Sequence, residues 1–233
     1  MAEPAQPISF NEYRVRAGNI AVDCREAGSG LPVVFLESLQ WGHRPFYEAL
    51  ARQFHLFVLD FEDATVEGAE AAVREMAKSL AGKTYNLAGF SQGANLALRT
   101  VLRAPVDPEP AESLVLISPT AIRPNPDLPT LNWVGWADRL LAHKERHSYL
   151  GGLPNGWELE GLFSPKKNDG ELEEWLPEIK CPTLVAFGTR DRMTAPEAAS
   201  TYRANIPNCH VSLVYDTAHL VAPDRPEPSP TPS

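Results

Sequence analysis

Short apolar runs alternate with helix-like segments along most of the chain. The runs at 32–36 (PVVFL) and 55–59 (HLFVL) are almost continuously apolar, which is typical of strands that are covered on both faces. Further strands are predicted at 84–89, 113–117, 182–187 and 210–215. Helices are predicted where apolar positions recur every three or four residues, at 44–53, 68–80, 94–102 and 195–205.

The N-terminal part of the chain has a different pattern. Residues 13–17 and 20–26 are strand-like and are separated by Gly18-Asn19, which predicts an antiparallel hairpin. A hairpin followed by repeated strand–helix units favours a mostly parallel, eight-stranded sheet with helices on both faces. The predicted fold class is therefore α/β.

The segment 119–180 interrupts this alternation. It is rich in tryptophan, proline and glycine, and it holds only short helical stretches. We interpret it as a small helical cap insertion over the end of the sheet, within a core formed by residues 1–118 and 181–226. Residues 227–233 are rich in proline and serine and are predicted to be a disordered tail.

Composition narrows the possible classes of function. The 233 residues carry a formal net charge of −9 and show no basic stripe, which argues against nucleic-acid binding. The three cysteines have no paired spacing, so we read them as small buried apolar residues. Because the N-terminus lacks a signal-peptide pattern and no apolar run is long enough to span a bilayer, a cytoplasmic protein is expected, with no membrane partner.

One motif carries chemistry. Gly89-Phe90-Ser91-Gln92-Gly93 fits G-x-S-x-G, and it lies between a predicted strand and a predicted helix. In that context the pattern describes a sharp turn that presents a serine beyond the carboxyl ends of the strands. The backbone N–H of Gln92 would then lie at the helix N-terminus, where an oxyanion can bind. The alternative is a glycine-rich turn with an incidental serine, and the strand–turn–helix context favours a nucleophile.

A serine nucleophile needs a general base, and the base needs a carboxylate to orient it. Asp191 and His219 each follow a predicted strand near the C-terminus, so both would emerge at the same edge of the sheet as Ser91. Asp216 is the rival acid, but it is too close in sequence to His219. The order of the candidates along the chain is serine, acid, histidine.

This order, together with the GFSQG, GTRD and Ala-His segments, resembles the α/β-hydrolase superfamily. The similarity covers residues 13–226 and is greatest to the single-domain esterase, cofactor-independent haloperoxidase-like and carbon–carbon hydrolase-like group. The resemblance implies that Ser91 is the nucleophile, His219 the general base and Asp191 the orienting acid. It also implies a serine hydrolase that uses no metal or organic cofactor and cleaves a small carboxylic ester or a related acyl compound.

One stretch departs from the superfamily pattern. Relatives usually carry His-Gly after the strand equivalent to 32–36, whereas this chain has Glu37-Ser38. Aligned in this way, Leu39 would donate its backbone N–H to the oxyanion hole beside Gln92. A carboxylate that pointed from Glu37 towards a developing oxyanion would be unfavourable, which predicts a weak hydrolase.

Large apolar side chains are the feature of the sequence that indicates a substrate class. Trp41, Trp133, Trp136 and Trp157 are candidates for a pocket that takes a small acyl or aromatic group, and packing of the insertion on the core explains them equally well. Two other functions remain open: a catalytically weak or non-catalytic binding protein of this fold, and an acyltransferase. A small molecule is the expected partner, and the sequence does not indicate an oligomeric state.

Overall fold

The hairpin expected near the N-terminus is present. In the computed structural model, which describes residues 8–37, 44–61, 66–80, 84–103, 111–122, 141–142, 170–194 and 196–224, strands β1 (Asn11–Ala17) and β2 (Ile20–Gly28) pair antiparallel. Ala17 lies opposite Ile20, so Gly18 and Asn19 form the turn between them. Gly18 has a φ of 61°, a conformation that glycine adopts without steric cost.

The hairpin forms one edge of an eight-stranded sheet with the order β1-β2-β4-β3-β5-β6-β7-β8. Strand β2 also pairs antiparallel with β4, and all later pairs are parallel. The carboxyl ends of β3 to β8 therefore meet at one edge of the sheet. These strands are β3 (Pro32–Glu37), β4 (His55–Asp60), β5 (Asn86–Phe90), β6 (Ser113–Ile117), β7 (Thr183–Gly188) and β8 (Cys209–Val214).

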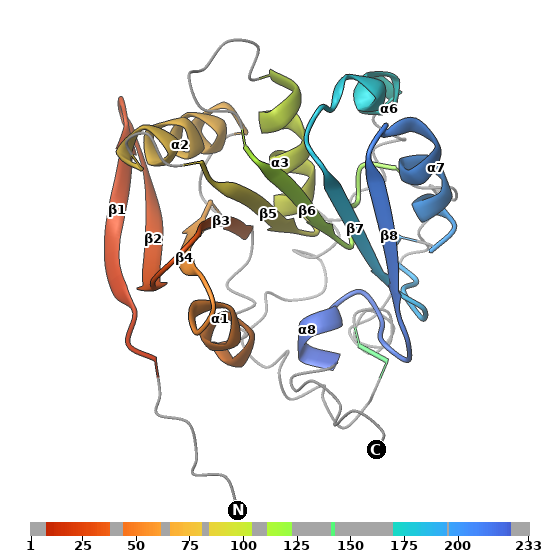
Figure 1. Ribbon diagram of the computed structural model, residues 1–233, viewed down its shortest axis with the longest axis horizontal. Helices are drawn as coiled ribbons and strands as arrows, with labels where there is room; N and C mark the ends of the chain where they lie inside the picture. The colour runs from red at the N-terminus through yellow and green to blue at the C-terminus, as the bar shows by residue number, and fades with distance from the viewer. Residues whose placement is uncertain are drawn as a thin grey trace, which may run out of the picture.

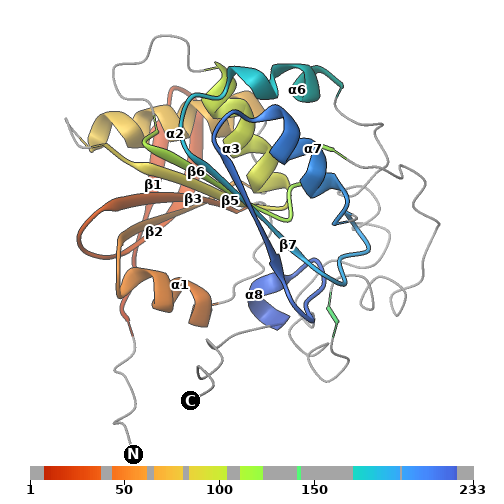
Figure 2. The same cartoon turned by 45° about the vertical axis from the view of Figure 1, so that its right-hand side comes forward.

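Helices lie on both faces of this sheet (Figure 1). Figure 2 shows four of them together on one face: α2 (Val66–Ser79), α3 (Gln92–Arg103), α6 (Gly170–Trp175) and α7 (Ala198–Asn205). A short 3-10 helix, η2 (Leu176–Glu178), continues α6. The opposite face carries α1 (Arg44–Ala51), and the four-residue helix α8 (Val221–Asp224) lies near the ends of β7 and β8.

The core has two parts because the side chains of each strand alternate between the two faces of the sheet. In the fully buried strand β3, Val34 and Leu36 belong to the larger apolar cluster, which also includes α2 and α3 residues. Val33 and Phe35 belong to the smaller cluster beneath α1. Burial on both faces explains why this strand is continuously apolar in the sequence.

The predicted α/β class, the eight strands and their mostly parallel arrangement are confirmed, with strand ends within two residues of the predicted ones. Helix α7 begins at Ala198, whereas the prediction began at 195. The residues before it form a tighter turn, in which the carbonyl oxygens of Pro196 and Glu197 each accept from an N–H three residues ahead. Most of the predicted insertion and all of the predicted tail lie outside the described residues, so both remain predictions.

Candidate active site

Ser91 lies in a sharp turn between β5 and α3. Its φ of 54° is in the left-handed region, which is rare for a residue with a side chain. Two glycines make the turn possible. A Cβ at Gly89 would overlap the carbonyl of Gly93, and a Cβ at Gly93 would overlap the carbonyl of Leu36 at the end of β3. The helix therefore starts in direct backbone contact with the neighbouring strand.

The structure brings together the three side chains that the sequence analysis singled out. The Oγ atom of Ser91 lies 2.9 Å from Nε2 of His219. The Nδ1 atom of His219 lies 3.0 Å from Oδ2 of Asp191. The three residues are 1%, 0% and 3% exposed, respectively, so the Ser91 hydroxyl faces the imidazole rather than bulk water.

Four hydrogen bonds hold the carboxylate of Asp191. Its Oδ1 accepts from the backbone N–H groups of Met193 (2.8 Å) and Thr194 (2.9 Å). Its Oδ2 accepts from the hydroxyl of Thr194 (2.9 Å) and faces Nδ1 of His219. Because an ionised carboxylate can only accept, the proton of the imidazole belongs on Nδ1, which leaves Nε2 as an acceptor for the hydroxyl of Ser91.

Two turns at the carboxyl ends of β7 and β8 position the acid and the histidine. The N–H of Arg190 donates to the carbonyl of Thr217 at 2.8 Å, which joins the two turns. Asp216, the rival acid, instead pairs with the guanidinium of Arg190 at 2.6 Å. The aromatic ring of Phe90 packs against the imidazole of His219, with 5.4 Å between the ring centroids.

The sequence analysis missed four residues that support this arrangement. Thr194 donates to Asp191, and the amide of Asn95 bonds the backbone of Thr120 and Ala121 beyond β6. Ser118 and Asp224 contact the backbone around His219. These short polar side chains bond backbone groups that are distant in sequence, except that of Thr194. Only the position of Thr194, three residues after Asp191 in the same turn, was a usable signal.

Of the two predicted oxyanion donors, Gln92 lies among the described residues and Leu39 does not. Gln92 is the first residue of α3, so its N–H lies in the first turn of the helix and beside Ser91. Leu39 lies outside the described residues, as does Ser38. The role of Leu39 as a donor therefore stays a prediction.

The carboxylate of Glu37 has partners away from the serine. Glu37 is buried at the end of β3, and its Oε2 accepts from the guanidinium of Arg25 at 3.0 Å. A second hydrogen bond joins it to Tyr47 of α1. Burial raises the pKa of Glu37 to about 7, against the lowering effect of the Tyr47 hydrogen bond and the Arg25 charge. The carboxylate is thus held on the α1 face of the sheet.

The predicted substrate-pocket residues lie outside the described part of the chain: Trp41, Trp133, Trp136 and Trp157. All three cysteines are free. Burial raises the pKa of the Cys24 thiol to about 11, which argues against a nucleophilic thiolate at this position. Among the described residues, no cluster of metal-ligating side chains is present and no helix has the length and apolar character to cross a membrane.

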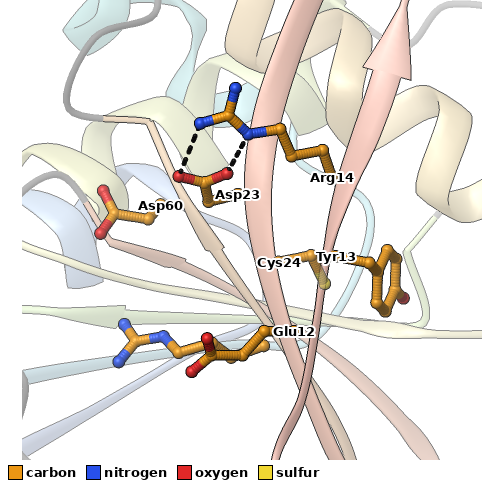
Figure 3. Close-up of a pocket in the computed structure, with 7 residues that line it drawn as sticks. Glu12, Tyr13, Arg14, Asp23, Cys24 and Asp60 are labelled. Atoms are coloured by element: carbon orange, nitrogen blue, oxygen red, sulfur yellow. Dashed lines mark hydrogen bonds and ion pairs between the residues drawn. The ribbon is translucent and has the colours of Figure 1, made fainter.

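A hollow of about 540 Å³ lies on β1 and β2, the two outermost strands on one side of the sheet (Figure 3). Two of its charged side chains pair across the hairpin: Nε of Arg14 donates to Asp23 at 2.6 Å. Strand β2 is separated from β5, the strand that precedes Ser91, by β4 and β3. This hollow is therefore distinct from the candidate site around Ser91.

The chain is similar to known proteins in its fold and not in its sequence. No protein-family model matches the chain, and no curated protein sequence matches it. Solved structures do match. They include a serine hydrolase from the polyaromatic hydrocarbon-degrading bacterium Cycloclasticus zankles, with 15% identity, a TM-score of 0.73 and 93% of each chain covered.

Two further structures are similar. One is 2-hydroxy-6-oxo-6-phenylhexa-2,4-dienoate hydrolase from Rhodococcus sp. strain RHA1, with 16% identity and a TM-score of 0.72 over 94% of this chain and 95% of that one. The other is a carboxylesterase from Bacillus subtilis, with 21% identity and a TM-score of 0.64 over 94% of this chain and 88% of that one. Together with the sheet order and the turn at Ser91, these matches show that the chain has the α/β-hydrolase fold.

Proposed function

We propose that this protein is a serine hydrolase that cleaves a small carboxylic ester or a related acyl compound through an acyl-enzyme. One observation carries the proposal: the buried chain of hydrogen bonds from Ser91 through His219 to Asp191, with distances of 2.9 and 3.0 Å. The similar structures named above are hydrolases on the same fold, which supports the same class of reaction.

The first half of the reaction forms the acyl-enzyme. As Oγ of Ser91 bonds to the carbonyl carbon of the substrate, its proton moves to Nε2 of His219. The tetrahedral intermediate then collapses, the bond to the leaving group breaks, and His219 gives the proton to the departing oxygen. Asp191 keeps the imidazole in the required tautomer and stabilises the cation formed during transfer.

The second half releases the acid. His219 takes a proton from water as the water oxygen attacks the acyl carbon, and the bond to Oγ of Ser91 breaks as the proton returns to the serine. Each half requires neutral His219 at the start, because only an unprotonated Nε2 can accept the proton. No external oxidant, reductant or metal enters this scheme.

The negative oxygen of the intermediate needs hydrogen-bond donors. The N–H of Gln92 is the proposed donor at the start of α3, where the helix end also favours negative charge. The N–H of Leu39 is the proposed second donor. Glu37 is bonded to Arg25 and Tyr47, which removes the objection that its carboxylate would oppose the oxyanion.

The decisive experiment compares wild type with Ser91→Ala. Wild type should hydrolyse p-nitrophenyl esters and should be labelled covalently by a fluorophosphonate at Ser91, as read by mass spectrometry of the peptide. Ser91→Ala should lose both. A panel of esters, lactones and β-diketones assayed on the same two proteins then identifies the class of acyl compound, and added alcohols reveal any acyl transfer.

Ser200→Ala is a matched control, because Ser200 is an exposed serine of α7 whose hydroxyl donates to the carbonyl of Glu197. It should keep full activity and labelling. If folded wild type is neither labelled nor active, or if labelling persists in Ser91→Ala, the proposed function is wrong. The first result would favour a non-catalytic binding protein of the same fold.

A further inference from the structure

Asp224 is a buried carboxylate that the proposed mechanism does not use. It ends α8 and is 1% exposed. Its Oδ2 accepts from the backbone N–H of Ala218 at 2.6 Å and from that of Ala142 at 2.9 Å, and its Oδ1 lies 3.1 Å from the same Ala142 nitrogen. A carboxylate is costly to bury unless its oxygens are bonded, so these N–H groups help to keep Asp224 in place.

The bond to Ala218 fixes the chain directly before His219. The carbonyl of His219 is fixed as well, because it accepts from the hydroxyl of Ser118 at 2.9 Å and from the N–H of Val221 at 3.0 Å. Ser118 is fully buried, and its own N–H donates to Ala186 of β7 at 2.8 Å. The backbone on both sides of the histidine is therefore anchored, once to a carboxylate and once to the central sheet.

Such anchoring matters because the imidazole must meet two partners at once. Ser91 follows β5 and Asp191 follows β7, and both are held by backbone hydrogen bonds of their own. Only His219 comes from a segment after the last strand of the sheet. A displacement of about 1 Å at this residue would break one contact or the other, and errors of that size cost about 100-fold in rate.

Asp224 also reaches a second segment. Ala142 belongs to the stretch between β6 and α6, which the sequence predicts to be an insertion. One carboxylate thus joins residue 142 to residue 218, and both bonds end on backbone N–H groups that any residue except proline would keep. A shift of the backbone at Ala142 would therefore displace the Asp224 carboxylate, which also bonds the residue before His219.

We propose that Asp224 is a positioning residue for His219, and that it couples the segment at Ala142 to the geometry of the Ser91–His219–Asp191 relay. This inference rests on the proposed function. In this role Asp224 neither touches substrate nor exchanges a proton. Its role is to hold the peptide before His219 so that Nε2 stays within hydrogen-bonding distance of the Ser91 hydroxyl.

The kinetic test uses Asp224→Ala and Asp224→Asn in the full chain. Asp224→Ala removes both bonds and should lower kcat by about 30- to 100-fold with little change in KM, because the relay is misaligned while the binding surface is kept. Asp224→Asn keeps the shape but loses the charge, so its hydrogen bonds weaken and a smaller loss of about 3- to 10-fold is expected. Asp23→Asn is the control, since Asp23 lies on the surface of the hairpin, and it should match wild type.

A second readout separates positioning from general stability and does not need turnover. In protein labelled with ¹⁵N-histidine, the Nδ1–H proton of His219, bonded to Asp191, should give a low-field resonance that is absent in His219→Gln. It should shift or broaden in both Asp224 variants and stay unchanged in Asp23→Asn. This measurement still decides the positioning role if the wild-type protein proves inactive and the proposed function fails.

The coupling to Ala142 has its own test. Ala142→Pro removes that N–H and also fixes φ at residue 142, so the coupling is read from the double variant: Ala142→Pro should lower kcat but should add nothing further when combined with Asp224→Ala. Independent, additive losses would disprove the coupling. If Asp224→Ala and Asp224→Asn both fold and keep the wild-type kcat and resonance, the positioning role is wrong. Should Asp224→Ala fail to fold, Asp224→Asn alone decides by the same two readouts.

Discussion

Gly188, the last residue of β7, packs directly against the backbone carbonyl of Ala218, the residue before His219. A Cβ at residue 188 would overlap that oxygen and also the carbonyl of Thr217. This contact lets the turn that carries Asp191 approach the segment that carries His219. The pairing of acid and histidine thus depends on a missing side chain as much as on the side chains present.

Substitution of Gly188 by alanine should therefore destabilise the protein. The atoms that a Cβ would meet are backbone atoms and cannot rotate away, so we expect a loss of about 3 kcal/mol in the free energy of unfolding, at the upper end of the usual range for overpacking. Urea denaturation followed by circular dichroism measures it. The fraction of Gly188→Ala that still folds should have lost most of the esterase activity.

Gly18→Ala is the control for this substitution. Gly18 has a positive φ but open space around it, so only backbone strain of about 1 kcal/mol is expected. A loss at Gly188 no larger than that at Gly18 would show that the segment at Ala218 yields easily, contrary to the prediction.

Thr194→Val tests the support of Asp191. Thr194 is fully buried, and its hydroxyl donates one of the four hydrogen bonds to the carboxylate. Removing that donor should cost about 1 kcal/mol of stability, the usual net value of a hydrogen bond, and should lower kcat a few-fold because the acid is less firmly oriented. Thermal unfolding and ester hydrolysis measure the two effects.

Thr194→Ser keeps the hydroxyl and loses only a methyl group. It should therefore recover most of the lost kcat relative to Thr194→Val. If serine and valine are equally impaired, the methyl packing and not the hydrogen bond is what matters at this position.

Glu37→Gln tests the buried carboxyl on the α1 face. Burial raises the pKa of Glu37 from 4.5 to about 7, so the folded state binds this proton more tightly than the unfolded state. The contribution of Glu37 to the free energy of unfolding is therefore greatest below pH 4.5, and it is lost as the pH rises towards 7. Between pH 4.5 and 8 the wild type should lose about 3 kcal/mol relative to Glu37→Gln.

Chemical denaturation at several pH values between 4.5 and 8 gives the two stability curves. Glu12→Gln on the exposed hairpin serves as the matched control and should run parallel to wild type. Parallel curves for wild type and Glu37→Gln would mean that Glu37 ionises in the folded protein as readily as in water.

Sequence patterns predicted the sheet well because burial on both faces leaves a continuous apolar signature, as in β3. The elbow at Ser91 was predictable for a related reason: close backbone approach requires glycine, and Gly89 and Gly93 are spaced accordingly. The proximity of Asp191 and His219 to Ser91 was predictable because each follows a strand whose carboxyl end lies on the same side of the sheet as that of β5.

The supports of the candidate site could not be predicted in this way. Ser118 bonds a carbonyl 101 residues away and Asp224 bonds an N–H 82 residues away, and a backbone N–H or carbonyl has no identity in the sequence. The partners of Glu37 were hidden for a different reason. Arg25 comes from β2, which is joined to β3 only through β4, and Tyr47 comes from α1, which packs on this face of the sheet.

The spacing of the three site residues along the chain also constrains when function can arise. Ser91 and His219 are 128 residues apart, and the last strand must be in place before the imidazole can reach the hydroxyl. Such long-range pairings form late, since closing large loops is entropically slow. During refolding, esterase activity should therefore return later than secondary structure. The time at which activity returns would mark the pairing of β8 with β7 and the docking of the His219 segment.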